Sequence, residues 1–151
     1  MPTIKTSLIK EKRLSQYNHP PPMKSFIYSF EEAGELPFSL EEKKALFGGK
    51  VAALADMTHI DLPIPPGFII TTEACHEYLL KGTYPEGFWI HFENQLKALG
   101  GKLGKTFCDP KNPLLVSVRS GSKISMPGMM DTILNLGLTD QTIQGLIKKT
   151  Q

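Results

Sequence analysis

The chain has 151 residues, of which 40% are hydrophobic and 21% charged, as expected for one globular domain able to bury a core. Its 17 Lys and Arg nearly balance 15 Asp and Glu, which gives no electrostatic basis for binding nucleic acid. No apolar run approaches the roughly 20 residues of a membrane span, and Cys75 and Cys108 lack the spacing of a metal site. We therefore expect a cytoplasmic protein with free thiols and neither a membrane nor a nucleic-acid partner.

Residues 1–23 differ in composition from the rest of the chain. They combine lysines with hydroxyl residues and end near the run Pro20-Pro21-Pro22. Consecutive prolines lack N–H donors and resist both helix and central strand, so we predict a flexible N-terminal arm closed by a stiff linker. A transit peptide is the alternative, but Glu11 and the lack of an arginine-rich amphipathic pattern argue against it.

The next stretch, residues 24–30 (KSFIYSF), alternates polar with aromatic or aliphatic side chains, which is typical of a strand. Residues 31–38 contain a glycine and a proline and predict a turn-rich connection. Ser39 is followed three residues later by Glu42, a capping-box pattern that predicts a short helix interrupted at Gly48-Gly49.

From Lys50 onward, apolar residues at helical spacing predict a helix that ends before the prolines of residues 61–66. A buried strand is predicted over 67–70, followed by a helix to residue 81 that begins at Thr71 or Thr72. The further predicted elements are a helix over 86–99 ended by Gly100-Gly101 and Gly104, a buried strand over 114–119, an apolar run over 133–136 and a helix over 140–149. Strands that alternate with helices indicate an α+β or α/β layered domain.

Arg119 lies at the end of the predicted strand and is followed at once by Ser120-Gly121-Ser122. A guanidinium offers a planar fork of donors, and a glycine-rich backbone can bring its N–H groups close to an anion, so this strand end suits phosphate oxygens. A lone arginine after a strand is more often a surface or ion-pair residue. The apolar residues predicted to be buried before it favour the binding role.

Gly48-Gly49-Lys50 lies at the start of the next predicted helix. The first N–H groups of a helix lack partners, and the helix dipole favours an anion there, to which Lys50 would add an ammonium group. The GxxxxGK[ST] spacing of a Walker A loop is missing, and by spacing alone a Gly-Gly-Lys is usually a surface turn.

Four stretches together resemble the nucleotide-binding domain of the pyruvate, phosphate dikinase family: GGKVAALADM at 48–57, LPIPPGFIITTEAC at 62–75, SVRSGS at 117–122 and SMPGMMDTILNLGL at 125–138. The resemblance covers roughly residues 24–149. Phosphoenolpyruvate synthases share elements of the GGK, PPGF and VRSS types, whereas the MPGMMDT run points to the dikinases.

By this resemblance, Lys50 contacts the phosphates of ATP, and Arg119 reaches the same phosphates as a catalytic residue that assists phosphoryl transfer. Gly128, Met130 and Asp131 lie in a stretch that resembles the family's glycine-containing loop over the phosphates. Gly128 would let backbone N–H groups approach phosphate oxygens. Met130 would line the nucleotide channel or fill the core, and Asp131 would orient a cation or cap the following turn.

Two residues depart from the family's pattern. Val51 replaces a usual glycine after the lysine; a β-branched residue does not easily adopt a positive φ and fills space, so we expect the approach of the nucleotide to be altered. Lys123 replaces a small residue and adds charge, which either strengthens anion binding or is solvated. The histidines show no HxH or HExxH spacing, so no metal site is expected in this chain.

The resemblance implies an α+β fold, the first subdomain of an ATP-grasp-like nucleotide-binding domain, over residues 24–138, with residues 139–151 starting the next, truncated helical subdomain. It implies ATP as ligand, with Mg²⁺ held by carboxylates outside this chain. The implied reaction converts ATP, pyruvate and phosphate to AMP, phosphoenolpyruvate and pyrophosphate. The implied partners are the rest of a dikinase, namely a second ATP-grasp subdomain, a phosphohistidine domain and a pyruvate-binding barrel. The alternative is a truncated, non-catalytic paralogue that docks on another protein.

Overall fold

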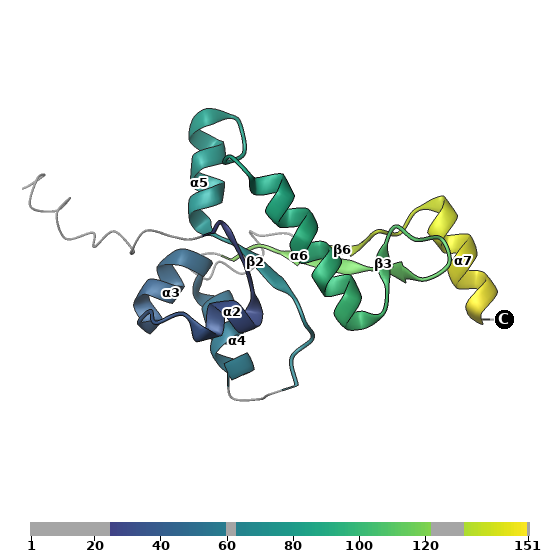
Figure 1. The fold of residues 1–151 in the computed structure, drawn as a ribbon, viewed down its shortest axis with the longest axis horizontal. Coiled ribbons are helices and arrows are strands. Elements are labelled where there is room, and N and C mark those ends of the chain that lie inside the picture. Colours follow the sequence, from purple (N-terminus) through teal and green to yellow (C-terminus); the bar gives the residue numbers. More distant parts are fainter. Residues whose placement is uncertain (1–24, 60–62, 122–131, 151) are drawn as a thin grey trace, which may run out of the picture.

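A computed structural model describes residues 25–59, 63–121 and 132–150, and the α+β class is confirmed (Figure 1). Its helices are α2 (Phe30–Glu35), α3 (Leu40–Phe47), α4 (Gly49–His59), α5 (Thr72–Lys81), α6 (Phe88–Leu103) and α7 (Asp140–Thr150). Its strands are β1 (Ile27–Ser29), β2 (Phe68–Ile70), β3 (Thr106–Phe107), β4 (Pro113–Leu114), β5 (Val116–Arg119) and β6 (Thr132–Leu136). None of the helices in these ranges is long and apolar enough to cross a membrane.

Within these ranges the strands form two-stranded sheets: β1 with β2 and β5 with β6 antiparallel, and β3 with β4 parallel. Figure 1 shows α2, α3 and α4 together at one end of an elongated molecule and α7 at the other. The predicted arm at residues 1–23 lies outside the described residues, so it stays a prediction.

The main core lies under the β1–β2 sheet, where Tyr28 pairs with Ile69. Tyr28 meets Phe47 edge to face, with ring centroids 5.8 Å apart, and both side chains are buried. The other buried members of this cluster come from three helices and β2: Ala33, Leu46, Ala55 and Ile69. The cluster joins α2, α3 and α4 into one packed unit, which places the start of α4 against the sheet.

A helix occupies most of the region predicted to be a turn-rich connection, so that prediction was wrong. Helix α2 begins after Ser29, whose Oγ accepts from the Glu32 N–H at 3.1 Å while the Ser29 N–H donates to the Glu32 carboxylate at 2.7 Å. This reciprocal pair is a capping box, which satisfies two donors that a helix start leaves without partners. The Ser-x-x-Glu pattern was present in the sequence, but Ser29 also ends β1 and was assigned only to the strand.

The predicted caps of α3 and α5 are confirmed. Ser39 and Glu42 form a second capping box, in which the Ser39 N–H donates to the Glu42 carboxylate at 2.8 Å. The bonds from Ser39 lower the pKa of Glu42 from its ordinary value. Thr71 caps α5 through its Oγ1, which accepts from the Ala74 N–H, and Thr72 Oγ1 donates to the Ala45 carbonyl at 2.9 Å. These bonds fasten the start of α5 to α3.

A buried lysine ties three helices together. The Lys43 ammonium group donates to the Gly34 carbonyl at the end of α2, at 3.0 Å, and to the Asp56 carboxylate on α4, at 2.8 Å. Lys43 lies on α3 and is only 7% exposed. An ammonium group so far from water needs these partners, because desolvating a charge costs several kcal/mol.

An ion pair connects α2 to the distant α6. Lys102 Nζ donates to Glu31 Oε1 at 2.8 Å, and this bond lowers the pKa of Glu31 below its ordinary value of 4.5, against the opposing effect of burial. A carboxyl whose pKa is lowered on folding stabilises the fold above its unfolded pKa, and this contribution disappears as the pH falls through the folded pKa. The pair is half exposed, so we expect it to contribute less than about 1 kcal/mol.

We expect Lys102→Ala to raise the pKa of the Glu31 carboxyl toward its ordinary value, as measured by an NMR pH titration. The variant should also be less stable than the original protein at neutral pH, and the difference should vanish once the pH falls well below 4.5. Lys97→Ala is the matched control, since Lys97 lies on the same helix and pairs only loosely with Glu93, at 3.7 Å. An equal pKa change in both variants would contradict this assignment.

The predicted buried strand over residues 114–119 is only partly correct. Leu114 is buried, but the strand breaks at Leu115, and β5 exposes most of its side chains, with Val118 49% exposed. In the described part of the chain, β5 pairs only with β6, and the register shifts between Val116 and Val118. A two-stranded ribbon buries little unless another layer packs on it, which explains the exposure.

The last helices follow their predicted positions with one boundary error. Gly100-Gly101 was predicted to end the helix that began near residue 86, but α6 continues to Leu103 and ends at Gly104 in a left-handed conformation. Helix α7 begins after Thr139, which caps it by accepting a hydrogen bond from the Thr142 N–H at its Oγ1, at 3.2 Å.

Candidate functional site

The turn that joins α3 to α4 consists of a single residue, Gly48, with φ 81° and ψ 153°. This backbone region is essentially restricted to glycine. The Gly48 N–H donates to the Lys44 carbonyl and closes α3, while its carbonyl accepts from the Ala52 N–H and opens α4, both at 3.0 Å. The N–H groups in the first turn of α4, including that of Lys50, have no helix carbonyl one turn earlier to accept a hydrogen bond from them. They form a local positive potential suited to an anion.

The backbone of Gly48 lies directly against the backbone of Gly121, beyond the end of β5. A Cβ added to Gly48 would lie 2.9 Å from the carbonyl carbon of Gly121, and a Cβ added to Gly121 would lie 2.9 Å from the Phe47 carbonyl oxygen. Such distances are too short for real Cβ atoms, so both positions require glycine. Two motifs that are distant in the sequence therefore meet.

This contact brings the two predicted cationic site residues into one neighbourhood. Lys50 follows Gly48 by two residues and is exposed in the first turn of α4, and Arg119 precedes Gly121 by two residues and is exposed at the end of β5. Lys50 and Arg119 are thus both exposed, and each lies two residues along the chain from the Gly48–Gly121 contact. Positive side chains together with free helix N–H groups are the groups that phosphate oxygens require.

Val51 has a packing role in this contact. It is not among the described non-glycine residues with positive φ, which are Cys108 and Asn135, so a positive φ is not needed at this position. Its side chain packs on the main core cluster and reaches Gly121, with Cγ2 3.1 Å from the place of an added Cβ. The expectation that Val51 fills space near the Gly48-Gly49-Lys50 turn is confirmed, and its effect on the approach of a nucleotide stays a prediction.

The other three predicted site residues, Gly128, Met130 and Asp131, lie outside the described residues. The described chain stops at Gly121, beside Gly48, and resumes at Thr132, which pairs with Arg119 in the β5–β6 register. Gly121 and Thr132, the described residues on either side of this stretch, therefore lie beside Gly48 and Arg119, respectively. The roles of these three residues remain predictions.

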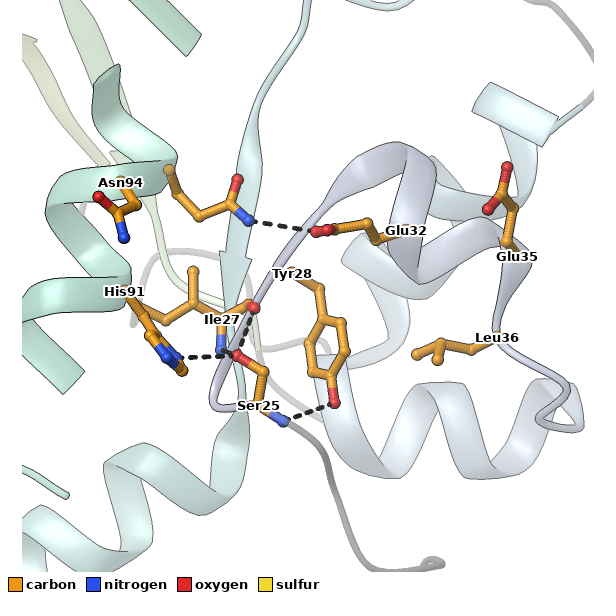
Figure 2. A pocket seen from close by; sticks show the side chains of 9 residues that line it. Ser25, Ile27, Tyr28, Glu32, Glu35, Leu36, His91 and Asn94 are labelled. Carbon is orange, nitrogen blue, oxygen red and sulfur yellow. Dashed lines mark hydrogen bonds between the residues drawn. The ribbon is translucent and has the colours of Figure 1, made fainter. Parts of the chain in front are cut away.

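A separate cleft of about 570 Å³ lies between β1, α2 and α6 (Figure 2). Its polar lining includes the carboxylates of Glu32 and Glu35, and its lining residues are Ser25, Ile27, Tyr28, Glu32, Glu35, Leu36, His91, Asn94 and Gln95. Sequence reasoning did not identify this cleft. Among the described lining residues there is neither Lys50 nor Arg119 nor any other Lys or Arg, so the charge of this lining disfavours a phosphate ligand.

The described residues do not fit a metal ion. In residues 25–59, 63–121 and 132–150, no group of three or more His, Cys, Asp or Glu side chains could hold one. We therefore derive no step through Mg²⁺ for this part of the chain.

Comparisons with known proteins indicate the family to which this chain is related. A family model described as "Pyruvate phosphate dikinase, AMP/ATP-binding domain" matches residues 44–86, which include Gly48 and Lys50. The pyruvate, phosphate dikinase of Giardia intestinalis is 48% identical over 125 residues, and that of Entamoeba histolytica is 48% identical over 125 residues. The chloroplastic pyruvate, phosphate dikinase 1 of Arabidopsis thaliana is 52% identical over 108 residues.

These alignments cover 82%, 82% and 71% of this chain but only 14%, 13% and 11% of the three dikinases. The chain thus spans a small fraction of the length of the relatives that it matches. Near 50% identity over most of a chain is far above what unrelated sequences share, and the family model covers the α3–α4 turn. The chain therefore belongs to the pyruvate, phosphate dikinase family, in the region of its AMP/ATP-binding domain.

Proposed function

We propose that this chain binds ATP and holds its phosphates at the Gly48–Gly121 contact. The observation that carries the proposal is the backbone contact itself, because the first turn of α4 with Lys50 and the end of β5 with Arg119 each lie within two residues of it. Because neither Gly48 nor Gly121 has a Cβ atom, a polyphosphate can approach the backbone closely. The likeness to an AMP/ATP-binding domain supports a nucleotide as the source of the phosphates.

Each cation has a distinct role in this proposal. The Lys50 ammonium group acts as a point charge on the phosphates nearest the start of α4, and the Arg119 guanidinium group binds two oxygens at once through its planar fork. Arg119 would be the residue closest to the chemistry, since charge that develops on a transferred phosphoryl group is stabilised by such a fork. Gly128, Met130 and Asp131 complete the site from the stretch whose two ends meet there.

We further propose that the fold is the first subdomain of an ATP-grasp-like domain, and that the bound ATP serves a dikinase reaction with pyruvate and phosphate. In this view, the groups that hold Mg²⁺, carry the phosphohistidine and bind pyruvate belong to other parts of a dikinase. Support comes from the dikinase relatives, which are much longer than this chain. Phosphoryl transfer needs charge neutralisation from both sides of the phosphates, so this chain alone is expected to bind ATP without transferring its phosphate.

Isothermal titration of the full chain with ATP tests the proposal. We expect Arg119→Ala to weaken ATP binding by about 1.5–3 kcal/mol, because a charged hydrogen-bond partner is lost, and Lys50→Met to weaken it by a similar amount. Arg119→Lys should recover only part of the loss, since it restores the charge and not the fork.

Lys105→Met is the matched control for Lys50→Met, because Lys105 is exposed and lies outside the site, next to the end of α6. It should leave the affinity for ATP unchanged. An original protein that does not bind ATP at millimolar concentration would contradict the proposal and favour the alternative, a non-catalytic module that docks on another protein. Equal losses in the Lys50 and Lys105 variants would place the ATP elsewhere.

A further inference from the structure

A second surface groove, which we call the aromatic groove, lies where α5 and α6 meet. It has a volume of about 560 Å³, and its main walls are the side chains of Tyr78, Tyr84, Pro85, Phe88 and Trp89. Tyr84 stands at its centre, with its ring centroid 4.7 Å from Tyr78, 4.9 Å from Phe88 and 4.8 Å from Trp89. The rings hold one another in place, so the groove is formed in the absence of any ligand.

The aromatic groove is open rather than part of the core. Tyr78, Tyr84 and Trp89 are 41%, 44% and 53% exposed, while Phe88 is buried beneath them. Adjacent exposed rings that line a cavity are typical of a binding surface. None of the described residues that line it is charged, so the groove suits an uncharged ligand rather than a nucleic acid or an acidic peptide.

The chemistry of the aromatic groove fits a proline-rich segment in the polyproline II conformation. Proline rings pack on the faces of Tyr and Trp, and the peptide carbonyls accept hydrogen bonds from the Tyr hydroxyl and the Trp indole N–H. A polyproline II segment leaves its carbonyls free and loses little entropy on binding, because it is already extended. Grooves of this kind recognise runs of prolines through ridges of aromatic rings.

The chain itself contains such a run a few residues before Ser25, its first described residue. Residues 20–22 are all proline, and Ser25 follows them by three positions. Figure 2 shows Ser25 facing His91 on α6, with Ser25 Oγ 3.4 Å from His91 Nδ1. Phe26, which follows Ser25, packs against the buried cluster that contains Phe88, a wall of the aromatic groove.

The connection between Ser25 and the prolines is short. An extended chain covers about 3.3–3.6 Å per residue, so Pro22 lies within about 11 Å of Ser25 and Pro20 within about 18 Å. Attachment at such short range gives an effective concentration in the millimolar range, which is enough to fill a weak site. We propose that the aromatic groove binds the Pro20–Pro22 segment of the same chain.

The sole tryptophan of the chain makes this proposal testable, because Trp89 forms a wall of the aromatic groove. In the full chain, the variant Pro20→Ala/Pro21→Ala/Pro22→Ala should show a red-shifted Trp89 emission. Its acrylamide quenching constant should rise by roughly a factor of two, because about half of the Trp89 surface is open when the groove is empty. The control Thr3→Ala/Thr6→Ala/Ser7→Ala changes as many residues of the same arm and should behave like the original protein.

A peptide of residues 15–24 provides the second arm of the experiment. Added to the triple-proline variant, it should restore the original quenching constant, whereas the same peptide with three alanines should not. Identical quenching in the original protein and the proline variant would overturn the proposal, as would a change of the same size in the control. The measurement uses no nucleotide, so its outcome does not depend on the proposed ATP site.

Discussion

Replacing Gly48 with alanine is expected to destabilise the protein by about 2–6 kcal/mol and to abolish its binding of ATP. The backbone angles of Gly48, φ 81° and ψ 153°, are almost closed to other residues, and forcing an alanine into them costs about 1–3 kcal/mol. The new Cβ would also lie 2.9 Å from the carbonyl carbon of Gly121, and overpacking of this kind adds about 1–3 kcal/mol. Urea unfolding followed by circular dichroism measures the loss.

The neighbouring glycine is a matched control for this variant. Gly49 has an ordinary backbone conformation inside α4, and none of the described atoms outside its own helix and adjacent residues lies within 4 Å of an added Cβ. Gly49→Ala should therefore leave stability unchanged or raise it by up to about 1 kcal/mol, since alanine favours a helix. If both variants lost the same stability, the close approach of Gly48 to Gly121 would not be what requires glycine.

The second large effect is expected at Asp56, where Asp56→Ala should cost about 2–3 kcal/mol. The variant leaves the buried Lys43 ammonium group with the Gly34 carbonyl as its remaining described partner. Removing one partner of a fully buried ion pair costs about 3–5 kcal/mol. The cost should be lower here, because the Asp56 side chain is 44% exposed and water can replace part of the interaction.

Glu41→Ala tests the same chemistry at the surface. Glu41 pairs with Lys44, the neighbour of Lys43, at 2.9 Å, but both side chains are exposed. The loss should stay below about 1 kcal/mol, from a solvated ion pair and a small interaction with the start of α3. Equal unfolding free energies for the Asp56 and Glu41 variants would show that burial of Lys43 does not strengthen its ion pair.

The features that could be predicted from the sequence are those decided by neighbouring residues. The caps at Ser39, Thr71 and Thr139 depend on side chains within three positions, so short patterns were sufficient. The cap at Ser29 follows the same rule but was overlooked, because the residue also belongs to β1. Gly100 was predicted to end a helix, yet α6 continues through it. The absence of a Cβ at Gly100 instead permits a close contact with the Lys105 carbonyl.

Burial and long-range contacts were harder to predict because distant residues decide them. Val118 has a strand-like apolar sequence around it, but its exposure depends on whether a further layer covers the β5–β6 ribbon. Lys50 and Arg119 were each identified from a local motif with the help of the family resemblance. The contact between Gly48 and Gly121, each two residues from one of these cations, is a property of the fold, and no local pattern in the sequence contains it.

The most direct test of the central claim is an NMR titration of the ¹⁵N-labelled chain with ATP. If one site holds the phosphates, the amide signals of Gly49, Lys50 and Val51 should shift together with those of Ser120 and Gly121, and one dissociation constant should fit them all. Adenosine, which lacks phosphates, should leave these signals unmoved. Shifts confined to one of the two motifs, or saturation of ATP binding with all five signals unchanged, would contradict a shared phosphate site.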